Sequence, residues 1–218
     1  MQDEDALKDL TPEDLISSAT HAYAIAKKLG RKVIIMSCST GGTLSLLLAS
    51  EHPEIAGLIM YSPNIRLKDP AAKILNDPWG LHIGRMVVGG KYYQYEQSEE
   101  YQKYWYTKYR VEGLVALQSL LESTMQESTF KKVKQPAFMA YYYKNDSLQD
   151  QLVSVKAAQE MMKQLSTPQA LKTSVAIPEA GHHIMASYLC SKDLKKLQKE
   201  TFRFADDILK LTPQKSEK

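Results

Sequence analysis

A stretch near the N-terminus, VIIMSCSTGG (residues 33–42), constrains the fold more than any other part of the sequence. Its first four residues are apolar, and four apolar residues in a row are typical of a short strand buried on both faces of a sheet. The stretch then turns to small and hydroxylic side chains, and residues 41–51 continue as an apolar helix. A strand, a tight turn at Ser39 and a helix predict a serine held at the carboxyl edge of a parallel sheet.

The neighbours of Ser39 are small on both sides. Ser37 lies two residues before it and Gly41 two residues after it, which gives S-x-S-x-G where the usual nucleophile turn reads G-x-S-x-G. Such a turn is crowded, and the first position needs only a small side chain. The motif alone fits a helix-capping serine equally well, so the rest of the chain must decide.

The remaining sequence alternates between short apolar runs and amphipathic segments. This alternation predicts a mainly parallel sheet with helices on both faces, in a chain of 218 residues that is long enough for one domain. We predict strands at residues 33–36, 55–63, 136–143 and 173–177, and helices at residues 11–30, 41–51, 153–165 and 194–211.

An insert, residues 65–132, lies between the second and the third predicted strand, and we predict it to be mostly helical. It is rich in polar and aromatic residues, with seven tyrosines and Trp105 between residues 92 and 109. The expected division is therefore a core of residues 1–64 and 133–218 and a separate insert of residues 65–132. The tyrosines fit ordinary packing of the insert at least as well as contact with a substrate.

A serine hydroxyl is a weak nucleophile and needs a base, which in turn needs an acid to orient it. His182 and His183 follow the last predicted strand, in IPEAGHHIMAS, and Asp146 and Asp150 follow the strand before it. All of these positions fall at the same edge of the sheet as Ser39. The pattern predicts a Ser-Asp-His triad, and the residues themselves leave both the acid and the histidine open.

With these motifs the chain resembles the α/β-hydrolases, and most closely their capped carboxylesterase and monoacylglycerol-lipase branch. The resemblance runs from about residue 10 to residue 211 and includes the serine turn, YSPN, D-x-x-V-S and GHHI. It implies that the insert is a helical cap and that the acid is Asp150, not Asp146. The glycine before the histidine pair favours His182, but the apolar residues after it favour His183, which we prefer. The backbone N–H of Thr40 is the implied donor to the oxyanion.

The same resemblance implies that something is missing at the front. Roughly 80 to 100 residues usually precede the serine in this family, including one donor of the oxyanion hole, whereas 38 residues precede Ser39. We therefore expect a chain lacking the N-terminal strands, as a fragment, a mis-started reading frame or a genuinely truncated protein. The strand at residues 33–36 would then have one edge and part of its faces uncovered. Loss of one oxyanion donor costs roughly 100- to 1,000-fold in rate.

The expected function is a serine hydrolase that cleaves small-molecule carboxylic esters, with no cofactor and no metal. The Tyr-rich face of the insert and Met86, Val87 and Val88 would bind the acyl or alkyl group. The alternatives are a thioesterase or peptidase on the same triad, and a non-catalytic protein that forms a homodimer or pairs with a partner through the exposed sheet edge. A formal net charge of +3 and scattered lysines give no reason to expect nucleic-acid binding. The acidic N-terminus lacks the pattern of a signal peptide and no run approaches the roughly 20 apolar residues of a membrane span, so we expect a cytoplasmic protein.

Overall fold

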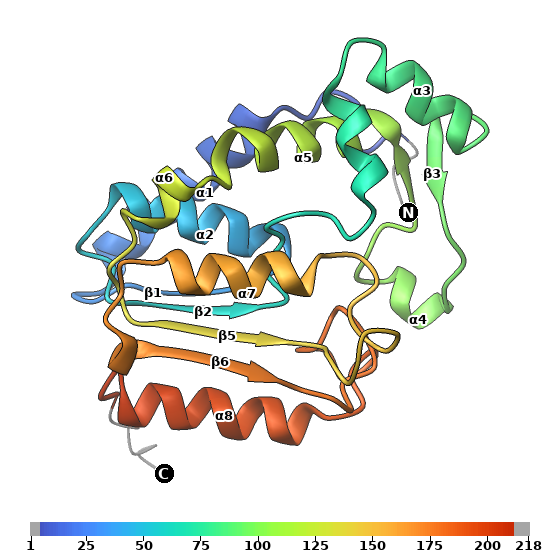
Figure 1. The fold of residues 1–218 in the computed structure, drawn as a ribbon. Helices are drawn as coiled ribbons and strands as arrows, with labels where there is room; N and C mark the ends of the chain where they lie inside the picture. Colours follow the sequence, from blue (N-terminus) through green and yellow to red (C-terminus); the bar gives the residue numbers. More distant parts are fainter. Residues whose placement is uncertain (1–4, 212–218) are drawn as a thin grey trace.

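The computed structural model describes residues 5–211, and the first four residues and residues 212–218 lie outside that range. Its centre is a parallel four-stranded sheet in the order β1-β2-β5-β6 (Figure 1). Each predicted strand is confirmed with small shifts at its ends. The strands are β1 (Ile34–Cys38), β2 (Gly57–Tyr61), β5 (Ala137–Tyr141) and β6 (Lys172–Ala176).

Helices cover both faces of the sheet, as predicted. One apolar core forms between the sheet and α1, α2 and α7, and it includes Leu46, Met60, Met139 and Met161. The other forms under α8 alone and includes Phe138 and Phe204 (Figure 1). The helices are α1 (Pro12–Leu29), α2 (Thr40–Glu51), α7 (Val155–Gln164) and α8 (Leu194–Asp207), with a short η2 (Gln169–Leu171) before β6.

Strand β1 departs from its prediction. The apolar run by itself predicts burial on both faces, and this is wrong for Met36, which is 60% exposed at the centre of β1. The second expectation, that part of the faces of this strand is uncovered, is confirmed. The reason is its place in the sheet: β1 lies at the edge of the described strands, and α8 packs on β5 on that face. The apolar pattern reports the preference of the side chains for burial, whereas the covering elements decide whether burial occurs.

The insert is built from short elements that Figure 1 shows above the sheet and at the side toward which the strands point. They are η1 (Pro70–Asn76), α3 (Gly80–Val87), β3 (Tyr92–Gln94), α4 (Glu99–Gln102), β4 (Lys108–Arg110), α5 (Val111–Thr124) and α6 (Glu127–Phe130). The antiparallel pair β3–β4 is a small ribbon that the prediction of a mostly helical insert did not contain. At the end of the insert, Phe130 joins the main apolar core, which ties the insert to the sheet.

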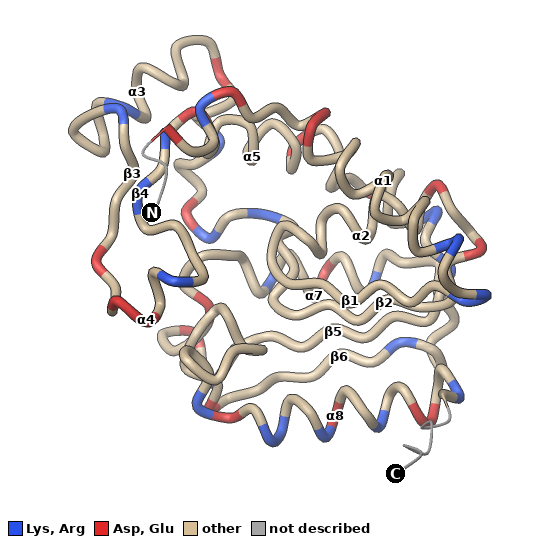
Figure 2. The backbone as a smooth tube through the Cα atoms, turned by 180° about the vertical axis from the view of Figure 1, so that it is seen from behind, with Lys and Arg blue, Asp and Glu red and all other residues tan. Residues whose placement is uncertain are grey.

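Lys and Arg are interspersed with Asp and Glu around the described chain and do not gather on one face (Figure 2). On α8, for example, Arg203 lies near both Glu200 and Asp207, at 3.8 and 3.7 Å. Among residues 5–211, no helix is both long enough and apolar enough to cross a membrane.

Candidate active site

Ser39 occupies the turn between β1 and α2 in a strained backbone conformation, with φ 54° and ψ −122°. Positive φ is rare for a residue with a side chain, and it persists where the surroundings enforce it. The backbone N–H of Ser39 donates to the carbonyl of Tyr61 at 3.0 Å, which fixes the turn to the end of β2. A Cβ on Gly41 would lie 3.3 Å from the Cβ of Ser37, so the need for small residues on both sides of Ser39 is evident in the packing.

Thr40, the expected oxyanion donor, is the first residue of α2. The first N–H groups of a helix have no acceptor within the helix, and the positive end of the helix dipole favours negative charge nearby. The backbone N–H of Thr40 is therefore suitably placed to stabilise an anion that forms at Ser39.

The structure brings Asp150 and His183 together. Asp150 Oδ2 lies 2.6 Å from Nδ1 of His183, and the two side chains are 0% and 7% exposed. The other carboxylate oxygen, Oδ1, accepts backbone N–H bonds from Leu152 at 2.9 Å and Val153 at 3.2 Å. Burial by itself raises the pKa of Asp150, but the hydrogen bond to His183, its charge and the two backbone bonds outweigh burial and hold that pKa below its usual value.

The two alternatives from the sequence, His182 and Asp146, take no part in this pair and have other partners. His182 uses its Nδ1 to accept the backbone N–H of Ile184 at 3.0 Å, and burial together with the neighbouring His183 lowers its pKa. Asp146 is exposed and accepts the hydroxyl of Tyr143 at 2.8 Å. Of the four combinations that the sequence leaves open, the structure pairs Asp150 with His183.

A cavity of about 510 Å³ runs from these residues into the insert. Ser39 and His183 both line it, and much of the remaining wall is apolar, with Leu75, Ile83, Val88, Val111, Leu114 and Leu117. In the described part of the chain no hydrogen bond joins Ser39 to His183. Catalytic hydrogen bonds are often long or absent until a substrate binds, so the missing bond does not argue against Ser39 and His183 acting together.

The aromatic and apolar residues expected to bind a substrate divide into two groups. Tyr93 and Tyr109 line the cavity, and so do Val87 and Val88. Met86 is 79% exposed and is not part of the wall. The other five tyrosines of the stretch and Trp105 are likewise not part of the wall; Tyr101 is buried against Tyr95 and Trp105, as packing of the insert requires.

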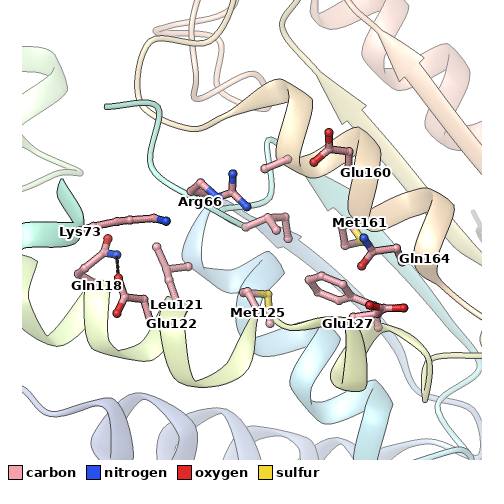
Figure 3. A pocket seen from close by; sticks show the side chains of 13 residues that line it. Arg66, Lys73, Gln118, Leu121, Glu122, Met125, Glu127, Glu160, Met161 and Gln164 are labelled. Carbon is pink, nitrogen blue, oxygen red and sulfur yellow. Dashed lines mark hydrogen bonds between the residues drawn. The ribbon is translucent and has the colours of Figure 1, made fainter. Parts of the chain in front are cut away.

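A second hollow of about 280 Å³ lies between α5 and α7, and none of the predicted catalytic residues lines it (Figure 3). Its rim carries charges of both signs, with Arg66 and Lys73 on one side and Glu127 and Glu160 elsewhere (Figure 3). Because no residue predicted to be catalytic lines this second hollow, the cavity at Ser39 is the candidate functional site.

Cys38, next to Ser39, has the properties of an inert thiol. Burial raises the pKa of Cys38 to about 11, with a smaller contribution from the charge of Asp150. A thiol with so high a pKa carries little thiolate at neutral pH and is a poor nucleophile or metal ligand. No three His, Cys, Asp or Glu side chains within residues 5–211 are grouped as they would be around a metal ion.

The site also includes a residue that sequence reasoning missed. Asn64 follows β2 directly, is 2% exposed and lines the cavity beside Ser39. Its only signal in the sequence is its position, the last letter of the YSPN that ends an apolar strand. A polar residue at the carboxyl end of a parallel strand is a place where a ligand can bind, but many such residues only end the strand.

The parallel sheet covered on both faces, the strained serine between strand and helix, and an acid and a histidine after later strands define an α/β-hydrolase fold. Residues 9–187 match the sequence model of the family Hydrolase_4, described as serine aminopeptidase, S33, and the chain belongs to this family. A comparison with curated proteins finds no match.

Solved structures support the same fold. The chain is similar to a structure from a study of LipS and LipT, two metagenome-derived lipolytic enzymes, with a TM-score of 0.71 and 16% identity over 92% of this chain and 76% of that one. It is also similar to a monoacylglycerol lipase from Paleococcus ferrophilus, with a TM-score of 0.63 and 13% identity over 89% and 75%. A third is Est1E from Butyrivibrio proteoclasticus with bound ferulic acid, with a TM-score of 0.58 and 18% identity over 93% and 71%.

Proposed function

We propose that this protein is a serine hydrolase that cleaves carboxylic esters with an apolar acyl or alkyl group. The observation that carries the proposal is that the strained Ser39 and His183, whose ring is paired with the buried Asp150, both line one apolar cavity of about 510 Å³. A lipophilic chain fits a wall of this composition, and the ester would lie at its polar end.

In this mechanism the oxygen of Ser39 attacks the ester carbonyl while Nε2 of His183 takes its proton. Asp150 holds the proton on Nδ1 and stabilises the imidazolium without becoming protonated itself. The N–H of Thr40 donates to the tetrahedral oxyanion. The alcohol leaves with the proton from His183. A water molecule then attacks the acyl carbon while His183 takes one of its protons, and His183 returns that proton to the oxygen of Ser39 as the acid leaves.

A fluorophosphonate probe tests the proposal, because it labels only a serine that is activated as a nucleophile. We expect the purified chain to be labelled and to hydrolyse 4-nitrophenyl esters, and Ser39→Ala to lose both properties. Ser166→Ala is a matched control, since the hydroxyl of this exposed serine bonds no described residue other than Lys131, whose carbonyl accepts it. Ester hydrolysis that persists in Ser39→Ala would refute the proposal.

Thioesters and amides remain alternatives, because the same three groups serve all acyl transfers. The family description names an aminopeptidase. A panel with one acyl group on oxygen, sulfur and nitrogen leaving groups separates the possibilities. We expect the oxygen ester to be cleaved with the highest kcat/KM, and faster cleavage of the anilide would favour the peptidase.

Pairing through β1 is a second, non-catalytic role that rests on a separate observation. The N–H of Ala56 donates to the carbonyl of Val33, and the N–H of Ser39 donates to the carbonyl of Tyr61. The backbone N–H and C=O groups of the odd-numbered residues of β1 therefore point toward β2. In a parallel strand the backbone groups of successive residues point to opposite sides, so the N–H and C=O of Met36 point away from β2, toward the open edge. An open apolar edge is a pairing site, and we infer a homodimer formed through it.

Light scattering after size-exclusion chromatography tests this second role. A dimer that Met36→Lys converts to a monomer would support it, because a lysine on an edge strand opposes pairing. A wild-type chain that stays monomeric over a wide concentration range would count against it.

A further inference from the structure

The second hollow, between α5 and α7, combines an apolar lining with a charged rim. Leu121, Met125, Phe130 and Met161 are among the apolar side chains that line it. Its volume of about 280 Å³ is a little below the roughly 300–1,000 Å³ of pockets that bind drug-sized ligands. The hollow is therefore suited to a small molecule with a short apolar chain.

Two cationic side chains reach this hollow without a partner. Arg66 and Lys73 both line it, and Figure 3 shows their charged groups on one side, with Glu127 and Glu160 on the other. The side chains of Arg66 and Lys73 form no ion pair and no hydrogen bond with another described residue. Two like charges at one hollow repel each other, so they favour a bound anion.

The protein's own acid on that side does not pair with these cations. Glu122 also lines the hollow, but its two carboxylate oxygens accept the side-chain amides of Gln118 and Asn76, each at 2.7 Å. The backbone of Arg66 is fixed, since its carbonyl accepts the N–H of Ser154 at 2.8 Å. A guanidinium and an ammonium that lie at one hollow are suitable donors to a carboxylate.

The acids on the other side restrict the rest of the ligand. Glu127 is paired with Lys131, whereas Glu160 has no ion pair with any described residue. A second negative charge on the ligand would be repelled there. The ligand that fits both sides has one carboxylate and an uncharged, apolar remainder.

We propose that the second hollow is a binding site for a small monocarboxylate, whose carboxylate is held by Arg66 and Lys73 and whose chain lies on the apolar lining. The site is distinct from the cavity at Ser39: Arg66 lines the second hollow, and the next residue, Leu67, lines the catalytic cavity. The inference goes beyond the proposed ester hydrolysis and does not depend on it.

Methyl NMR of the methionines, with hexanoate as the probe, tests where the ligand binds. Met125 and Met161 line the second hollow, and no described methionine lines the catalytic cavity. Hexanoate should shift both signals in a saturable way, with a Kd of about 1 mM or below. The signal of Met36, which is exposed at the edge of the sheet, should not move.

Charge-removing variants test how the ligand is held. Arg66→Met and Lys73→Met should each raise the Kd for hexanoate about 3- to 10-fold in calorimetry, because each removes one charged donor at an exposed site. Arg203→Met is the matched control: it removes the same charge from α8, on the other face of the sheet, and should leave the Kd unchanged.

Two further probes test the ligand class. Adipate is hexanoate with a second carboxylate at the far end, and hexan-1-ol has the same chain without a carboxylate. We expect both to bind at least about 10-fold more weakly than hexanoate, adipate because of the acids on the other side and hexan-1-ol because it lacks the anion.

Several results would overturn the inference. Met125 and Met161 signals that stay unmoved at about 10 mM hexanoate would mean that the hollow is not a site, or that hexanoate binds only in the catalytic cavity. Equal Kd values in the wild-type chain and both charge-removing variants, or equal binding of hexan-1-ol, would mean that no carboxylate is recognised here. None of these measurements uses ester hydrolysis, so the inference and the proposed function stand or fall separately.

Discussion

The exchange of Asp150 for asparagine is the sharpest test of how this site works. Two backbone N–H groups, from Leu152 and Val153, hold Oδ1 of Asp150 at 2.9 and 3.2 Å, and only a carbonyl oxygen can accept from them. In Asp150→Asn the amide oxygen must take that place. The NH₂ group is then forced to the position of Oδ2, which lies 2.6 Å from Nδ1 of His183.

An NH₂ group there can only donate, so Nδ1 of His183 must become the acceptor and its proton must sit on Nε2. The histidine is then in the wrong tautomer to take the proton of Ser39. We expect kcat to fall about 10,000-fold, which corresponds to about 5.5 kcal/mol of transition-state stabilisation. Stability should change by no more than about 1–2 kcal/mol, because both backbone bonds remain.

The assay compares kcat for a 4-nitrophenyl ester, together with the melting temperature, in the wild-type chain, Asp150→Asn and Asp146→Asn. The last variant is a matched control, because Asp146 is exposed and, among the described residues, its carboxylate accepts a hydrogen bond from the hydroxyl of Tyr143 alone. A folded Asp150→Asn variant with more than about one-tenth of the wild-type kcat, a loss below about 1.4 kcal/mol, would refute the tautomer argument. So would an equal loss in Asp146→Asn.

Three further variants test the surroundings of the site. Gly42→Ala should lower the free energy of unfolding by about 1–3 kcal/mol in a denaturant titration, because its Cβ would overlap Pro63. Ser37→Ala should leave that free energy unchanged or raise it by up to about 1 kcal/mol, because the buried hydroxyl of Ser37 has no partner among the described residues. In the insert, burial alone would raise the pKa of Glu112, but its hydrogen bonds to Arg110 and Arg85 lower that pKa to about 2. The carboxylate therefore stabilises the fold above its unfolded pKa of about 4.3, and this contribution is lost as the pH falls toward 2. Glu112→Gln should flatten the fall in melting temperature between about pH 5 and pH 2.

The sequence by itself determined the order of elements and the chemistry at their ends. Short apolar runs and capping residues are local signals: the hydroxyl of Thr11 accepts the N–H of Asp14, and α1 begins at Pro12, within one residue of the predicted start. Small residues around Ser39 are also a local requirement, because the crowding at a tight turn arises from residues within a few positions. These features depend on neighbours along the chain, and the sequence lists those neighbours directly.

Only the tertiary structure decided what depends on contacts between distant segments. Two adjacent histidines have nearly the same sequence environment, and the approach of Asp150 to His183 separates them. Met36 belongs to an apolar strand but is exposed, because no described element covers it. The buried Oδ1 of Asn64, which accepts no hydrogen bond from any described residue, became visible only when the ends of two strands came together. Burial and pairing are properties of the packed chain, so a one-dimensional pattern gives the preference of each residue while the fold decides which preferences are met.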